Sequence, residues 1–120
     1  MNIHVTEHSE FLTLSMKGRL DISTASMLKE EVMSHLEQGA RALILNMAQV
    51  DFINSSGLGT LVSILKEVRS SGGRLVLSNL ASYVQEIFEI TQLTEIFEIF
   101  PVEVDAQQAL KSAVKTGARV

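Results

Sequence analysis

The sequence has no cysteine and no tryptophan, and it holds one proline and one tyrosine. The lack of cysteine excludes a disulfide scaffold, a cysteine-ligated zinc or iron–sulfur site and thiol catalysis. Ten lysines and arginines stand against 14 aspartates and glutamates, a net charge of −4, and the sequence contains no basic run. Binding of nucleic acid, which relies on clustered cations and aromatic stacking, is therefore not expected.

Long apolar segments are also missing. No stretch approaches the roughly 20 apolar residues that cross a bilayer, and the first residues lack the pattern of a signal peptide. We therefore expect a cytoplasmic protein that does not bind membranes. A chain of 120 residues with 46% hydrophobic content can bury one apolar core, so we expect a single domain over residues 1–120.

The hydrophobic pattern alternates between strand-like and helix-like segments. Apolar residues at every second position predict a β-hairpin at 3–5 and 12–16. The remaining predicted elements are, in order, a helix at 25–36 capped by Ser23 or Thr24, a strand at 42–45, a helix at 58–68, a strand at 75–77, a helix at 80–88, a strand at 95–100 ended by Pro101, and a helix at 106–114. Residues 116–120 are expected to fray.

This order, ββαβαβαβα, predicts the fold class. Strands that alternate with helices indicate an α/β sandwich whose central sheet is mixed but mostly parallel. We expect about five strands and about four helices, with no internal repeat and no linker.

Patterns of known catalytic sites are absent. The segment that begins at Gly57 starts like a dinucleotide-binding fingerprint, but Val62 occupies the position of the last glycine. The serines at 55 and 56 lack the leading glycine of a nucleophile elbow. The three histidines are expected on the solvated surface, so we predict no metal site. Because the catalytic patterns are missing, we also predict no cofactor and no enzymatic activity.

Residues 51–59 form the one segment that a purely structural role does not explain, and we expect them to form a loop. Ser55 and Ser56 stand just before an amphipathic helix, where a hydroxyl can accept from the first backbone N–H groups. A cap needs one such residue and explains neither the second serine nor two glycines, each of which costs a helix about 1 kcal/mol relative to alanine. Small residues here leave a surface that another molecule can approach closely.

This segment resembles a known family, the STAS-domain anti-sigma-factor antagonists of bacterial partner-switching pathways. The run from Asn54 to Gly59, Asn-Ser-Ser-Gly-Leu-Gly, is similar to the family's Asp-Ser-Ser-Gly-Leu-Gly and follows the hydrophobic pair at 52 and 53. The run Gly-Arg-Leu-Asp at 18–21 is similar to the family's Gly-x-Leu-Asp, and the Gly-Gly pair at 72–73 precedes the next strand. The element order over essentially the entire chain is also that of the family.

The resemblance implies that Ser55 is phosphorylated. The kinase would be an anti-sigma factor of the serine-kinase type that uses ATP, and a metal-dependent serine phosphatase would restore the hydroxyl. The unphosphorylated chain, a monomer, would bind this kinase and release its sigma factor or another target. Asn54 stands where the family usually has an acidic residue, which removes one negative charge beside the acceptor.

Several assignments around Ser55 stay open. Ser56 is either an alternative acceptor or a helix cap, Asp21 either contacts the partner or caps the preceding helix, and Leu58 is either an exposed contact or a core residue. The expected partner-binding residues are Asp21, Asn54, Ser55, Ser56, Gly57 and Leu58. The alternative function is a STAS scaffold subunit of a lipid-transport or signalling complex, in which the serine is a cap and no kinase acts.

Overall fold

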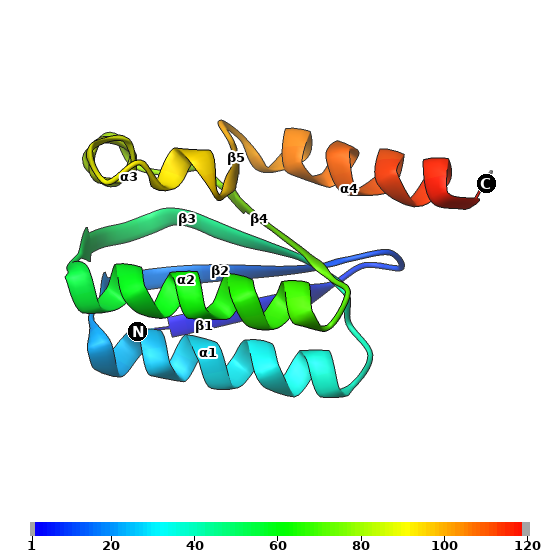
Figure 1. The fold of residues 1–120 in the computed structure, drawn as a ribbon, viewed down its shortest axis with the longest axis horizontal. Helices are drawn as coiled ribbons and strands as arrows, with labels where there is room; N and C mark the ends of the chain where they lie inside the picture. Colours follow the sequence, from blue (N-terminus) through cyan, green and yellow to red (C-terminus); the bar gives the residue numbers. More distant parts are fainter. Residues whose placement is uncertain (1, 119–120) are drawn as a thin grey trace.

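The structure is a computed structural model that describes residues 2–118 (Figure 1). Its elements are β1 (Asn2–Glu7), β2 (Leu12–Leu20), α1 (Ile22–Glu37), β3 (Ala42–Ile53), α2 (Ser55–Ser70), β4 (Arg74–Ser78), α3 (Ser82–Ile90), the 3-10 turn η1 (Leu93–Glu95), β5 (Glu98–Phe100) and α4 (Glu103–Ala118). The predicted order ββαβαβαβα is confirmed. None of the described helices is long and apolar enough to cross a membrane.

The five strands form one sheet in the order β1-β2-β3-β4-β5. The first two pair antiparallel, as the predicted hairpin requires, and the other neighbours pair parallel. The sheet is therefore mixed and mostly parallel, as predicted. Because parallel strands end at the same edge of a sheet, the ends of β2 and β3 lie together, and α1 and α2 both begin there (Figure 1).

The helices cover the two faces of the sheet unequally. The larger core cluster joins the buried stripes of α1 and α2 and the residues Val84 and Phe88 of α3 to one face of the strands. A smaller cluster holds Ile44 and Val76 of the other face against Ala106 and Leu110 of α4. The buried residues of α1, which are Ala25, Leu28, Val32 and Leu36, have the spacing of one helix face.

Some element boundaries differ from the prediction. The strand predicted at 42–45 continues to Ile53, and α2 begins at Ser55, so the loop predicted at 51–59 is wrong. The register between β2 and β3 shifts twice, which breaks the two-residue period that marks a strand in a sequence. At the other end of the chain α4 continues to Ala118, and residues 119–120 of the predicted frayed tail lie outside the described residues.

The strand predicted at 95–100 forms as a shorter strand. The 3-10 turn takes up residues through Glu95, and β5 contains three residues that end directly before Pro101. Gln92, which precedes this turn, has a φ of 62°, so the chain reverses there in a conformation that non-glycine residues rarely adopt. The turn therefore takes Glu95 from the predicted strand, and Ile96 and Phe97 link the turn to β5.

Candidate functional site

The candidate site lies where β2 and β3 end and the two following helices begin. Leu20 and Ile53 are paired neighbours at these strand ends. Asp21 and Asn54 come directly after them, and each is the N-cap of its helix. The fold therefore brings Asp21 and the serine segment to one edge of the sheet, although 33 residues separate the two caps in the sequence.

Asn54 performs the capping that the sequence assigned to a serine. Its side-chain oxygen accepts a hydrogen bond of 2.9 Å from the Gly57 backbone N–H. Ser55 and Ser56 occupy the first two helical positions, and both are exposed. Capping as the role of Ser56 is therefore wrong, because Asn54 already satisfies the N–H that a cap would bind.

Gly57 is buried because the helix start presses against the end of β2. A Cβ atom at this position would lie 2.2 Å from the carbonyl oxygen of Leu20. The same oxygen accepts a hydrogen bond of 3.3 Å from the Asn54 backbone N–H. The first glycine of the motif thus permits close packing of two backbones, whereas Gly59 faces open space.

Leu58 is neither a fully exposed contact nor a fully buried core residue, which are the two roles that the sequence left open. Its side chain is half-buried and packs against the larger core cluster. The rest of the residue is accessible to solvent. Leu58 therefore contributes to the core and to the surface of the site.

Asp21 caps α1, which settles one of its two proposed roles. Its carboxylate accepts from the Thr24 backbone N–H at 3.1 Å and from the Ser23 hydroxyl at 3.0 Å, and Thr24 completes a capping box. These two bonds, the backbone one first, lower the pKa of Asp21. The prediction of Ser23 or Thr24 as the cap is wrong, because the helix begins at Ile22.

One feature of the site escaped the sequence analysis. The Arg19 guanidinium lies 3.9 Å from the centre of the Phe52 ring, a cation–π contact across the paired ends of β2 and β3. Arg19 is thus held at the end of β2, two residues before Asp21 in the sequence. This contact depends on the register of β2 and β3. The two register shifts interrupt the regular pattern from which that register could be predicted.

The start of α2 leaves the Ser55 hydroxyl exposed. The hydrogen bonds that involve side chains here run from the Gly57 N–H to Asn54 and from the Thr60 hydroxyl to the Ser56 carbonyl, and among the described residues none involves the Ser55 hydroxyl. The N-terminus of a helix tolerates an anion well, because the free N–H groups and the helix dipole favour negative charge. Among the described residues no cluster of three or more His, Asp or Glu side chains forms a metal site.

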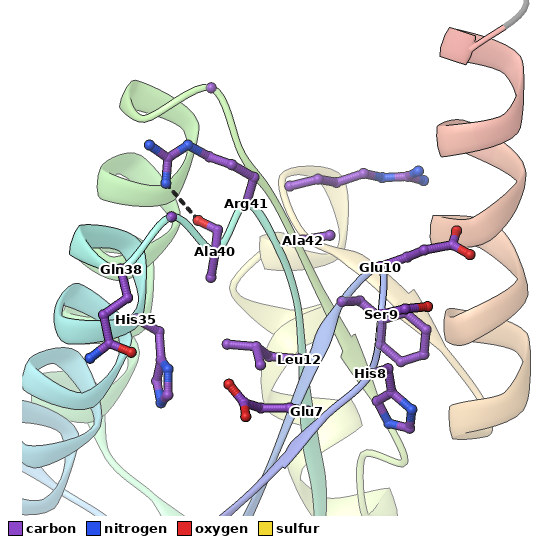
Figure 2. Close-up of a pocket in the computed structure, with 14 residues that line it drawn as sticks. Glu7, His8, Ser9, Glu10, Leu12, His35, Gln38, Ala40, Arg41 and Ala42 are labelled. Atoms are coloured by element: carbon purple, nitrogen blue, oxygen red, sulfur yellow. Dashed lines mark hydrogen bonds between the residues drawn. The ribbon is translucent and has the colours of Figure 1, made fainter.

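A cavity of about 450 Å³ lies at the opposite end of the sheet. Figure 2 shows it between the β1–β2 hairpin tip and the segment that leads from α1 into β3, with Arg41 hydrogen-bonded to the Ala40 carbonyl. His35, predicted on the solvated surface, lines this cavity and is half-buried. The length of β3, roughly 35 Å at about 3.3 Å per residue, separates the cavity from Ser55, and none of the predicted site residues lines it.

Comparison with known proteins places the chain in a family. The model of the STAS domain matches residues 2–106. The anti-sigma-B factor antagonist of Bacillus subtilis strain 168 is 32% identical over 89 residues, which cover 74% of this chain and 81% of the relative.

Solved structures agree with this assignment. A Thermotoga maritima protein matches with a TM-score of 0.84 at 26% identity, over 91% of this chain and 94% of that one. The Bacillus protein SpoIIAA in its phosphorylated form shares the fold, with a TM-score of 0.69 at 20% identity over 90% of this chain and 99% of that one. From the motif, the fold and these matches together, the chain belongs to the STAS-domain family of anti-sigma-factor antagonists.

Proposed function

We propose that the chain is a phosphorylation-controlled antagonist of an anti-sigma factor and that Ser55 is its phosphorylation site. The observation that carries the proposal is the exposed Ser55 hydroxyl at the first position of α2, beside a cap that does not use it. A relative that is an anti-sigma-B factor antagonist supports the class of partner, and SpoIIAA has structures in unphosphorylated and phosphorylated forms.

Phosphorylation would act on binding and leave the fold intact. A phosphoryl group adds about 1.5 to 2 negative charges at pH 7, which would shift the net charge from −4 to about −6. The helix N-terminus accommodates this charge. One new charge about 4 Å from a partner carboxylate costs roughly 4 kcal/mol at an effective dielectric constant of about 20, close to a thousandfold in affinity.

The proposed cycle needs two other proteins. A serine-kinase anti-sigma factor transfers the γ-phosphoryl group of its ATP to the Ser55 oxygen, the bond between the β- and γ-phosphates breaks, and ADP and the hydroxyl proton leave. A metal-dependent phosphatase hydrolyses the phosphoserine and restores the hydroxyl. The unphosphorylated chain binds the kinase through Asp21, Asn54 and the residues that follow it, and this exchange takes place in the cytoplasm.

Intact-mass spectrometry tests the acceptor. Wild type, Ser55→Ala and Ser56→Ala are each incubated with the kinase of the same pathway and ATP. We expect wild type and Ser56→Ala to gain one phosphoryl group and Ser55→Ala to gain none. If wild type stays unmodified, the scaffold function replaces this proposal, and if Ser55→Ala gains the group equally, the acceptor is another residue.

A further inference from the structure

The outer edge of β1 is the more open of the two edges of the sheet. The hydrogen bond from the His8 N–H to the Phe11 carbonyl, 2.9 Å long, fixes which residues of β1 bond to β2. Bonded and non-bonded pairs alternate in an antiparallel ladder. With the observed register, Asn2, His4 and Thr6 therefore point their backbone groups at β2, and Ile3, Val5 and Glu7 point theirs outward.

Natural sheets usually block such an edge, and β1 carries few of the usual blocks, Glu7 being its one carboxylate. Edge strands are commonly very short, or they contain proline, lysine or a bulge. The strand β1 has six residues without any of these, and its register is uninterrupted. At the opposite edge β5 has three residues and is followed by Pro101.

A groove runs beside this open edge on the α1 side of the sheet. It has a volume of about 440 Å³ and is lined by Ile3, Met27, Glu30, Glu31 and Ser34. The Met27 side chain is 50% exposed, which is high for a large apolar residue next to the core. The groove thus combines two apolar side chains with two carboxylates, and it lies beside the outward backbone groups of β1.

The charges of the groove identify the kind of segment that fits. Glu30 and Glu31 line it without a lysine or arginine among its lining residues. A second copy joined antiparallel at this edge would place its own α1, with the same carboxylates, opposite these, and like charges would repel. A segment with basic side chains meets complementary charge instead.

We propose that β1 binds an extended segment of another protein by strand addition, with apolar side chains against Ile3 and Met27 and a lysine or arginine beside Glu30. The segment pairs its backbone with the outward groups of Ile3, Val5 and Glu7. This surface belongs to β1 and α1 and does not include the serine segment, so the proposal is independent of phosphorylation.

Two acetylated, amidated peptides probe the surface in the full chain: Thr-Val-Thr-Lys-Thr-Val-Thr and the same sequence with glutamate in place of lysine. Amide hydrogen exchange, followed by NMR, reads out the binding site. We expect the lysine peptide to slow exchange at Ile3, Val5 and Glu7, whereas the amides of His4 and Thr6 are protected already. Slowed exchange at the start of α2, or none in β1, would overturn the proposal.

The charge preference is tested by affinity. We expect the lysine peptide to bind about fivefold more tightly than the glutamate peptide. Glu30→Lys should reverse this preference, and Glu37→Lys, which makes the same charge change on α1 outside the groove, should preserve it. Equal affinities for the two peptides would refute the proposal, as would a dimer of the chain alone that protects the same three amides.

Discussion

Replacing Gly57 with alanine adds one methyl group at the tightest backbone contact of the candidate site. The new Cβ would lie 2.2 Å from the Leu20 carbonyl oxygen and 3.0 Å from its carbonyl carbon. Both atoms belong to the backbone of β2 and cannot rotate away as the end of a side chain can. The helix or the strand must therefore move by about 1 Å, and a close-packed interior resists such movement.

The expected size of the effect follows from opposing contributions. Alanine gains about 1 kcal/mol over glycine in a helix. Overpacking typically costs about 1–3 kcal/mol, and movement of the helix start weakens the hydrogen bond from the Asn54 N–H to Leu20, a loss of about 1 kcal/mol. We expect a net loss of roughly 1–3 kcal/mol, or a fall in Tm of about 4–12 °C for a chain of this length.

Gly59→Ala is the matched control, because it makes the same chemical change two residues later in the same helix. Among the described residues no atom outside the adjoining helix backbone lies within 4 Å of a Cβ at this position, so the helix gains about 0.5–1 kcal/mol. Urea denaturation of wild type and both variants measures the free energy of unfolding of each protein. Equal m values confirm that these free energies are comparable. The reasoning is refuted if Gly57→Ala is as stable as wild type or if both variants shift in the same direction.

Three further changes test the site. Asn54→Ala removes the cap of α2 and should lower the free energy of unfolding by about 1 kcal/mol, whereas Asn54→Asp should retain the cap; an unchanged Asn54→Ala would contradict the capping role. Because the pKa of Asp21 is lowered from 3.8, its charge stabilises the fold above pH 3.8, and this contribution is lost as the pH falls through the folded-state pKa. The difference in unfolding free energy between wild type and Asp21→Asn should therefore shrink below about pH 4, and a constant difference would contradict this. Ser55→Asp should leave Tm nearly unchanged, because a helix N-terminus favours the charge of an aspartate. The same variant should bind the kinase more weakly in a pull-down titration. Loss of folding would instead support a structural role for the serine.

The sequence predicted the element order because each helix and each central strand carries a regular apolar pattern. The end of β3 broke this rule. Its residues in the larger core cluster stand two apart from Leu43 to Met47 and then three apart at Val50 and Ile53, since the register with β2 shifts there. A pattern of this kind matches neither a strand nor a helix, so the sequence predicts no strand beyond residue 45.

The candidate site was predictable in its residue types and less so in its roles. The serines and the neighbouring small residues stood out in the sequence, and the structure exposes both hydroxyls. The contact between Gly57 and Leu20 depends on the pairing of two strands, which no local pattern encodes. The cap of α2 was assigned to a serine because the helix start was placed too late.

At the start of α2, residues that stabilise the fold stand next to a residue that does not. Asn54 and Gly57 hold the helix against Leu20, whereas the Ser55 side chain projects from it and supports nothing in the described chain. A screen that selects variants for yield or thermal resistance would therefore reject many substitutions at Asn54 and Gly57 and retain nearly all at Ser55. Loss of the hydroxyl in a natural or engineered variant would go unnoticed unless its binding partner is part of the assay.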